Sequence, residues 1–368
     1  MKVLNFIWGF ALGAGIDKCF LTYTRLGEID DEIELKNVCI RIGGLDKHTD
    51  ALKNRNVDFI DIKSKKDLSW IHKLASTIRD YNPDLVFTHG FNGAIIMLIL
   101  RLLKGLKVKC IFTYHGAYLA PTHKQQVIAL IFNSLPIWIY KRLANRTICV
   151  SENTRQQLVK RGVPDHKLSV VYNGIADVEE CGDSALKLQP PAILSASRID
   201  GVKGLEYLLQ ALALLKDKNI DFHYYMVGEG PELKNLEMKA EKLGLTDNVD
   251  FVGFQSNVKS WLDSADIFVL PSLVENHSIA LLEAMRAEKA IVASNVGGNP
   301  ESVRDGIEGL LVPPRDAGAL AVALERMITD KNLRTTCAKA ARKRFEKEFT
   351  EEAMMRNIAR VLEDAATV

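Results

Sequence analysis

The chain has 368 residues, of which 47% are hydrophobic and 26% charged, and its formal net charge is +2. This length can bury two cores of ordinary domain size, and the composition is that of a soluble globular protein. No apolar run reaches the ~18–20 residues that a membrane-spanning helix needs. Aromatic residues make up 7% of the chain and do not interleave with the basic residues, which argues against nucleic-acid binding.

The charge is unevenly distributed along the chain. Residues 1–180 carry 25 Lys+Arg and 18 Asp+Glu, whereas the remaining residues carry 23 and 28. From Arg101 to Lys167 there are twelve basic residues and only two acidic ones. This run fits either a solvated basic face or contact with an anionic lipid surface or a lipid-phosphate substrate.

The six cysteines show no CxxC pair and no metal-type spacing. Several lie in apolar runs, so we expect reduced core residues in a cytoplasmic protein. The first fifteen residues could pass for a signal peptide. The alternative is a first strand at Val3–Trp8 followed by a glycine turn and a helix, which matches the pattern of the rest of the chain.

Apolar runs of strand length alternate with helical patterns from end to end. In the first half the expected strands lie near Val3–Trp8, Val38–Ile42, Val57–Ile60, Leu85–Thr88, Val108–Tyr114, Thr147–Val150 and Leu168–Tyr172. In the second half they lie near Ala192–Ala196, His223–Val227, Val249–Val252, Ile267–Leu270, Ala290–Ala293 and Leu310–Val312. This alternation predicts an α/β protein with two parallel sheets and crossover helices.

The domain boundary is expected in the acidic, non-periodic stretch from Ala176 to Pro191. We predict a first Rossmann-like domain over residues 1–176 and a second over 190–348. Residues 349–368 are expected to form a helix that packs back toward the first domain. Two such domains facing each other across a cleft would place a ligand at the carboxyl ends of both sheets.

The most informative segment follows the expected strand at Ile267–Leu270. Glu275 and Glu283 are separated by seven residues, and a helix is predicted to start at Ser278. Free N–H groups near His277, Ile279 and Ala280 would face an anion at the amino end of this helix. Two carboxylates beside such an anion site suit a sugar attached to a diphosphate.

Arg198 and Lys203 follow the first strand of the second half, in Ser197-Arg198-Ile199-Asp200-Gly201-Val202-Lys203-Gly204. Two fixed cations at a strand's carboxyl end can neutralise a diphosphate leaving group without a metal. The alternative is a basic turn before an ordinary helix. No Asp-x-Asp pair stands at a strand end, and we infer no required metal and no cofactor.

Glycine turns and histidines stand at other strand ends. The turns Gly13-Ala14-Gly15 and Gly228-Glu229-Gly230 would let the backbone approach a phosphate, although many such turns are only turns. His89 and His115 each end a strand of the first half and precede glycine. Such a histidine is commonly structural, but two at one edge favour ligand contact.

These motifs together resemble the retaining glycosyltransferases of family 4, which have the GT-B fold. The resemblance covers nearly the whole chain and is strongest from Val150 to Glu348. The motifs that carry it are Val150-Ser151-Glu152, Val171-Tyr172-Asn173-Gly174, Arg198 with Lys203-Gly204, Val227-Gly228-Glu229-Gly230, Phe251-Val252-Gly253-Phe254, the Glu275–Glu283 segment, and Val296-Gly297-Gly298 with Pro300-Glu301.

The resemblance implies that the first domain binds the acceptor and the second the nucleotide sugar, and it implies a role for each matching residue. Arg198 and Lys203 would bind the donor diphosphate, Glu283 the ribose and Glu275 the transferred sugar. His115 would hydrogen-bond that sugar from the first domain. The turn at Gly13 and Gly15 would approach the diphosphate or the acceptor, and Gly253-Phe254 the base. We predict further donor contacts at Gly228, Ser278, Ile279 and Ala280, and acceptor-side contacts at His89, Asn276 and His277.

The predicted function is therefore transfer of a hexosyl or N-acetylhexosaminyl group from a UDP- or GDP-sugar to a saccharide or lipid-linked acceptor, with retention and without a metal. Bacterial surface polysaccharide or glycolipid synthesis is the expected context, with attachment to the inner face of the cytoplasmic membrane as an option. The sequence departs from the family where Gly13-Ala14-Gly15-Ile16-Asp17 replaces Gly-Gly-x-Glu, and where Asn276, His277 and Ser278 replace Gly and Pro. A nucleotide-sugar epimerase of the same fold and a non-catalytic nucleotide-sugar-binding protein are the alternatives.

Overall fold

The computed structural model describes residues 1–9, 15–42, 52, 55–64, 66–116, 126–177 and 186–367. For residues 15–18 and 126–133 it describes the backbone only. The chain divides into two compact units, and each is described by itself. The first unit comprises Met1–Gly174 and Glu351–Val368, and the second comprises Ile175–Thr350.

The first unit is built on a seven-stranded parallel sheet. Its strand order is β3-β2-β1-β4-β5-β6-β7. In this doubly wound order the chain first adds β2 and β3 on one side of β1 and then adds β4 to β7 on the other side. The strands are β1 (Lys2–Trp8), β2 (Glu34–Ile42), β3 (Val57–Ile62), β4 (Leu85–His89), β5 (Lys109–Tyr114), β6 (Arg146–Cys149) and β7 (Leu168–Val170).

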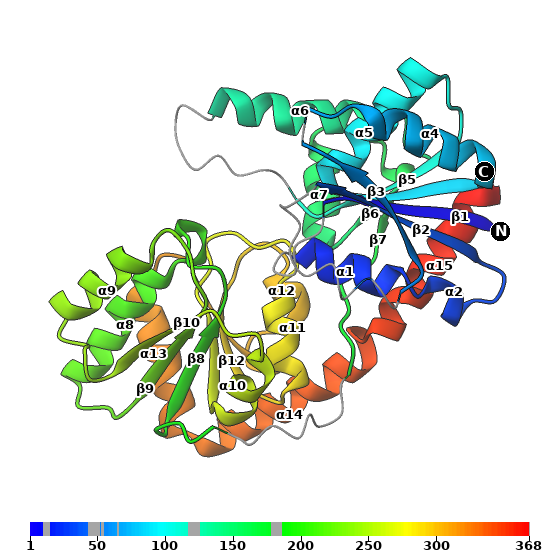
Figure 1. Cartoon of the computed structure of the whole chain (residues 1–368). Coiled ribbons are helices and arrows are strands. Elements are labelled where there is room, and N and C mark those ends of the chain that lie inside the picture. The colour runs from blue at the N-terminus through cyan, green and yellow to red at the C-terminus, as the bar shows by residue number, and fades with distance from the viewer. Residues whose placement is uncertain are drawn as a thin grey trace. The chain divides into compact units, whose positions relative to one another are not determined.

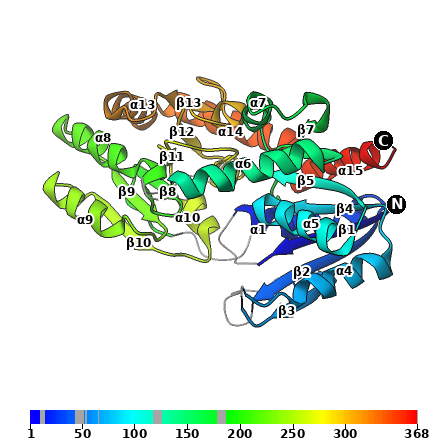
Figure 2. The same cartoon turned by 90° about the horizontal axis from the view of Figure 1, so that it is seen from above.

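Helices cover both faces of this sheet (Figure 1). They are α1 (Gly15–Tyr23), α2 (Leu26–Ile29), α4 (Ser69–Tyr81), α5 (Gly90–Lys104), α6 (Gln126–Arg142), α7 (Glu152–Lys160) and α15 (Glu351–Thr367). A short 3₁₀ turn, η2 (Asp165–Lys167), precedes β7. Helices α4, α5 and α6 pack on one face, where Leu74, Leu100 and Phe112 lie in the main core of the unit. Helices α5 and α6 lie side by side there (Figure 2).

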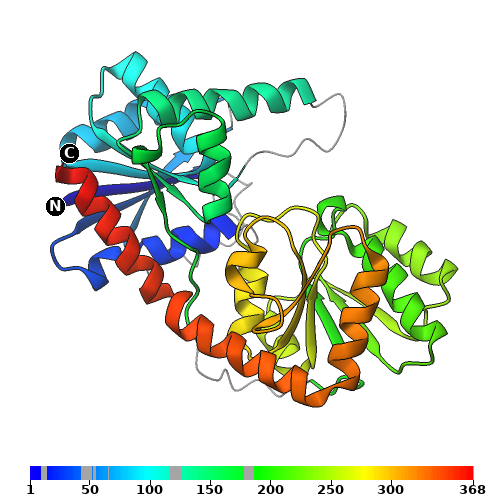
Figure 3. The ribbon, with the colours of Figure 1, turned by 180° about the vertical axis from the view of Figure 1, so that it is seen from behind.

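The last helix, α15, belongs to the first unit and packs against β5, β6, α1 and α2. Its burial pattern is one-sided, with Met354, Met355, Ile358 and Leu362 almost fully buried. The Lys109 ammonium, at the start of β5, donates to the carbonyl of Ala366 at 2.6 Å. The end of α15 therefore lies at the same edge of the sheet as the start of the strands (Figure 3).

The second unit is built on a six-stranded parallel sheet of order β10-β9-β8-β11-β12-β13. The strands are β8 (Ala192–Ala196), β9 (His223–Val227), β10 (Val249–Gly253), β11 (Ile267–Leu270), β12 (Ala290–Ser294) and β13 (Gly309–Val312). The helices are α8 (Leu205–Asp217), α9 (Leu233–Lys242), α10 (Val258–Ser264), α11 (Ile279–Arg286), α12 (Asn299–Ser302), α13 (Ala317–Thr329) and α14 (Lys331–Glu348), with a 3₁₀ turn η3 (Gly201–Lys203). Helices again lie on both faces (Figure 1).

The predicted α/β class, with two Rossmann-like parallel sheets, is confirmed. Each predicted strand has a counterpart, and β8, β9 and β11 have the predicted bounds. The prediction of buried cysteines is confirmed for the five whose environment is described; Cys181 lies outside the described residues. None of the described helices is long and apolar enough to cross a membrane.

Candidate functional site

The strongest candidate site lies at the carboxyl edge of the second sheet. The loops after β8, β9, β11 and β12 leave the sheet at this edge because the strands are parallel. These loops carry Arg198 and Lys203, Gly228, Glu275, and Gly297 respectively. The site is built within the second unit, and its geometry follows from bonds between these loops.

The β8 loop presents two cations in different surroundings. The Arg198 side chain is 75% exposed. Its Nε donates to Asp200 Oδ2 at 2.8 Å, and a terminal nitrogen forms an ion pair with the same oxygen at 2.5 Å. The other oxygen of Asp200 accepts from Val202 N at 3.2 Å and caps η3. Lys203 ends this turn, and its side chain is only 20% exposed.

The Lys203 ammonium lies against Glu275 from the β11 loop. It donates to Glu275 Oε1 at 2.6 Å, and the buried Ser272 hydroxyl donates to the same oxygen at 2.8 Å. The Glu275 side chain is 10% exposed, so this ion pair is largely withdrawn from water. The predicted cation and the predicted carboxylate therefore meet, although they are 72 residues apart in the chain.

Backbone contacts hold these loops together. Leu273 N donates to Val202 O at 2.7 Å, which joins the loops that carry Lys203 and Glu275. Gly297, in the β12 loop, has φ +56°, and a Cβ there would lie 1.6 Å from the carbonyl oxygen of Glu275. Only glycine fits this position without displacing the backbone of Glu275.

Helix α11 begins at Ile279, one residue after the predicted start at Ser278. Ser278 is its N-cap, and the Ser278 hydroxyl accepts from Leu281 N at 3.4 Å. The half-buried Ile279 and Ala280 open the first turn, where backbone N–H groups lack partners inside a helix. Glu283 is also half-buried and lies one turn further along. The amino end of α11 thus offers an anion site between the two carboxylate positions.

The β9 and β10 loops meet at their glycines. Gly228 N donates to Gly253 O at 2.8 Å, and a Cβ on Gly228 would lie 1.9 Å from Ser197 O in the β8 loop. Gly228 therefore permits the close packing of two loops at the site, a role in addition to the predicted approach to a phosphate. Phe254 follows Gly253 and is 59% exposed.

The predicted acceptor-side residues of the second unit differ in exposure. Asn276 is half-buried, whereas His277 is buried beneath the loop. Its Nε2 lies 3.2 Å from the Ser302 hydroxyl, and its ring packs on Phe349 with centroids 5.5 Å apart. Burial, aided by the charge of Arg344, lowers the pKa of His277 to about 3, so its ring is neutral. This placement favours support of the Glu275 loop.

His89 lies in the core of the first unit. Asn5 donates to Asn37 Oδ1 at 2.9 Å, which leaves Asn5 Oδ1 to accept from His89 Nε2 at 2.7 Å. The Thr113 hydroxyl can then donate to His89 Nδ1 at 3.2 Å, while Tyr23 stacks on the ring. Burial holds the pKa of His89 well below its ordinary value. Both ring nitrogens are engaged, which favours a structural role over acceptor contact.

His115 differs from His89 although both follow the same sequence pattern. It comes one residue after β5, and its Nε2 is buried without a hydrogen bond among the described residues. Burial lowers its pKa to about 4, so the ring is neutral near pH 7. Of the predicted glycine turn, Gly13 lies outside the described residues and Gly15 begins α1.

Sequence reasoning assigned no role to Asp200 or Ser272, which bond to Arg198 and Glu275 respectively. For Asp200 a signal was available, because an Asp just before Gly-Val is a common cap of a short turn. For Ser272 the only signal was its position after a buried strand.

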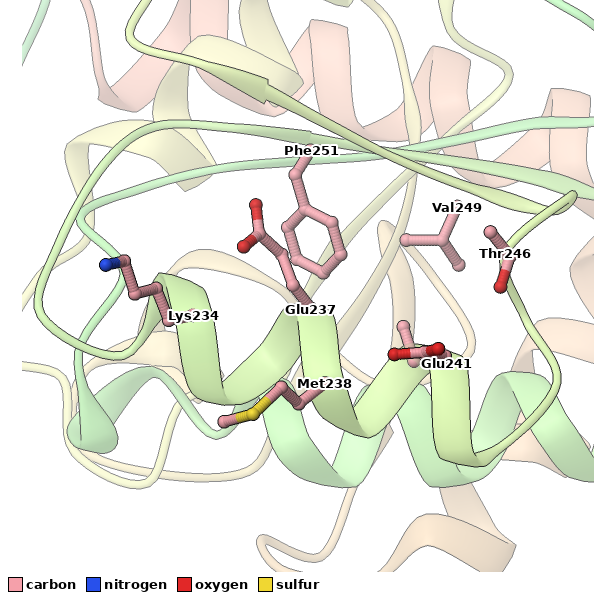
Figure 4. Close-up of a pocket in the computed structure, with 8 residues that line it drawn as sticks. Lys234, Glu237, Met238, Glu241, Thr246, Val249 and Phe251 are labelled. Carbon is pink, nitrogen blue, oxygen red and sulfur yellow. The ribbon is translucent and has the colours of Figure 1, made fainter.

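A groove of about 580 Å³ lies elsewhere on the second unit, between α9 and β10 (Figure 4). Lys234, Met238, Val249 and Phe251 are among its lining residues, and none of the predicted site residues lines it. Among the described residues no group of three His, Cys, Asp or Glu side chains could hold a metal ion.

Comparisons with known proteins agree with these features. A family model described as "Glycosyltransferase Family 4" matches residues 46–178, and one described as "Glycosyl transferases group 1" matches residues 179–344. The amylovoran biosynthesis glycosyltransferase AmsK of Erwinia amylovora is 31% identical over 315 residues, which are 80% of this chain and 73% of that protein.

One further relative is named for its substrates, and one similar solved structure contains a nucleotide sugar. The UDP-Gal:alpha-D-GlcNAc-diphosphoundecaprenol alpha-1,3-galactosyltransferase of Escherichia coli is 27% identical over 295 residues, 76% of this chain and 74% of that protein. The crystal structure of Anabaena HepE in complex with UDP-glucose superposes with a TM-score of 0.80 at 21% identity, over 99% of this chain and 100% of that chain. This likeness establishes the GT-B fold.

Proposed function

Because the chain belongs to glycosyltransferase family 4, we propose that it moves a sugar from a nucleoside diphosphate sugar to an acceptor hydroxyl with retention of configuration. The observation that carries this proposal is the meeting of Lys203 with Glu275, at 2.6 Å, at the strand edge that also carries Arg198. A cation for the leaving diphosphate and a carboxylate for the sugar are then held side by side.

The reaction asks mainly for charge stabilisation and positioning. The acceptor oxygen forms a bond to the anomeric carbon while the bond from that carbon to the diphosphate oxygen breaks. Arg198, Lys203 and the first N–H groups of α11 would stabilise the charge that develops on the diphosphate. The leaving phosphate can take the proton of the acceptor hydroxyl on the same face, so no separate base is required.

We propose contacts with other parts of the substrates for the remaining residues. Glu275 would face the transferred sugar, Glu283 the ribose, and Phe254 the base. His115 has a buried nitrogen without a hydrogen bond among the described residues, and we assign it a hydroxyl of the substrate. A neutral imidazole can serve there as a hydrogen-bonding group without adding charge.

The donor is proposed to be a UDP- or GDP-linked hexose or N-acetylhexosamine. A UDP-sugar is favoured because one relative is named for UDP-galactose and one related structure holds UDP-glucose. The acceptor is proposed to be a saccharide or a lipid-linked saccharide of bacterial surface polysaccharide or glycolipid synthesis, as in the names of the amylovoran and diphosphoundecaprenol relatives. Catalysis is proposed to need no metal, because fixed cations are present to neutralise the diphosphate.

We further propose that the first unit attaches to an anionic membrane surface, which would place the protein at the inner face of the cytoplasmic membrane. Leu102 and Leu103, in the last turn of α5, are 73% and 65% exposed, and Trp138 in the last turns of α6 is 48% exposed. The exposed Arg101 and Lys107 lie near the end of α5. The buried faces of α5 and α6 form core, so attachment would use these helix ends rather than whole helices.

Turnover by two cation variants tests the proposed reaction. A panel of UDP- and GDP-sugars is first assayed for transfer to saccharide and lipid-linked acceptors. Arg198→Ala and Lys203→Ala should each lower kcat by ~10²–10³ with the donor that is used. Lys218→Ala, which removes an exposed cation paired with Glu325, is the matched control and should retain activity. Wild-type kcat in either cation variant, or epimerisation of the donor without transfer, would refute the proposal.

A further inference from the structure

The two cations of the site differ in what holds them in place. Lys203 has a side chain that is mostly buried and a partner, Glu275, that the proposed reaction itself uses. Arg198 is 75% exposed, and exposed long side chains ordinarily sample many rotamers. An arginine that must meet a diphosphate in one geometry needs a fixed neighbour.

Asp200 provides that neighbour. One of its oxygens, Oδ2, accepts from Arg198 Nε at 2.8 Å and forms an ion pair with a terminal nitrogen of the same guanidinium, at 2.5 Å. This hydrogen bond and ion pair hold one edge of the guanidinium and leave its other N–H groups to face an anion.

Asp200 is itself anchored. Its side chain is 13% exposed, and Oδ1 accepts from Val202 N, which caps η3. Its carbonyl oxygen accepts from Lys203 N at 3.0 Å, and Val202 O accepts from Leu273 N of the Glu275 loop. One carboxylate thus links the exposed cation to the turn that carries the buried cation.

We propose that Asp200 is a positioning residue for the donor diphosphate, which holds Arg198 in the orientation that the leaving group requires. The inference rests on the proposed function, since it assumes that Arg198 meets the diphosphate. Asp200 touches no reacting atom and acts through Arg198. Its negative charge also repels the diphosphate, so we expect Asp200 to affect kcat more than the affinity for the nucleotide.

Asp200→Asn tests this role because asparagine keeps the shape and can still cap Val202, but cannot pair as a charge with Arg198. With the donor that wild-type protein uses, kcat should fall about tenfold, a loss typical of a misplaced group. The Kd for UDP, or for GDP if that is the nucleotide bound, should change less than threefold. Asp200→Ser introduces another capping residue, one that is too short to reach Arg198. It should likewise lower kcat and leave the Kd for the nucleotide nearly unchanged.

A double-mutant cycle separates positioning from general stability. In the Arg198→Ala background, Asp200→Asn should change kcat less than twofold, because the residue it positions is gone. Glu325→Gln, which removes the partner of Lys218 from another exposed ion pair, should leave kcat unchanged. Wild-type kcat in both Asp200 variants, or an equal loss in both backgrounds, overturns the inference alone. Wild-type kcat in Arg198→Ala, or no binding of UDP or GDP, overturns the proposed function and the inference with it.

Discussion

Replacing Glu275 by glutamine should change catalysis and nucleotide binding in opposite directions. In the structure Lys203 donates to Glu275 at 2.6 Å, and both side chains are at most 20% exposed. The diphosphate must therefore compete with Glu275 for the ammonium. A hydrogen bond between charged groups contributes ~1.5–3 kcal/mol net. Weakening this competitor should raise the affinity for UDP about tenfold, the equivalent of ~1.4 kcal/mol.

Turnover should fall in the same variant, because the carboxylate that faces the sugar is lost. We expect a decrease in kcat of ~10²–10³, the usual effect of removing one electrostatic group from a reacting centre. Glutamine retains an oxygen that can accept from Ser272, so the loop should keep its shape. Calorimetric titration with UDP and GDP, beside steady-state kinetics, measures both effects.

Two controls make the result decisive. Lys203→Ala should weaken nucleotide binding, and Glu275→Gln should no longer improve binding in that background. Glu283→Gln should weaken nucleotide binding and should lower kcat less than Glu275→Gln does. UDP binding at least threefold weaker in Glu275→Gln than in wild type would refute the competition between Glu275 and the diphosphate. Undiminished kcat would refute the role of Glu275 in the reaction.

Three other predictions follow from the charges and surfaces of the two units. Transfer activity should survive excess EDTA, and loss that Mg²⁺ or Mn²⁺ restores would contradict the reliance on fixed cations. His277 stays neutral when folded but titrates near pH 6.5 when unfolded, so its contribution to stability is lost as the pH falls from about 6.5 toward its folded pKa of about 3. Between pH 6.5 and 5.5 the free energy of unfolding should therefore drop ~1 kcal/mol more in wild type than in His277→Gln, by urea denaturation, and equal drops would contradict this. The protein should co-sediment with anionic but not with neutral vesicles. Co-sedimentation should decrease in high salt and in the double variant Leu102→Ser, Leu103→Ser. Equal binding to anionic and neutral vesicles would contradict an electrostatic attachment.

Much of the fold could be predicted because strands of a parallel sheet are buried on both faces and read as short apolar runs. The five residues of β8 and of β9 are all buried, and both strands have the predicted bounds. β2 begins at Glu34, four residues before the predicted start at Val38. Its first three residues are exposed or half-buried and the fourth, Asn37, is polar, so this part of the strand leaves no apolar signal.

The site could be predicted as far as strand ends allow. Arg198, Lys203 and Glu275 follow strands whose carboxyl ends share one edge of the sheet, so their proximity was expected. The contact between Lys203 and Glu275 was not predictable, because local sequence does not say which side chains of two loops meet. His89 and His115 have the same local pattern, yet only His89 has both ring nitrogens bonded within the core. That difference depends on Asn5 and Thr113, which come from other strands.

The central claim is that the loops after β8 and β11, with the amino end of α11, bind the diphosphate of a nucleotide sugar. A crystal structure of the protein with UDP tests this most directly. The account predicts phosphate oxygens within hydrogen-bond distance of Arg198, Lys203 and the first N–H groups of α11, with the Lys203 ammonium drawn from Glu275 toward the phosphate. A diphosphate bound elsewhere, or one that leaves the Lys203 ammonium on Glu275, would contradict it.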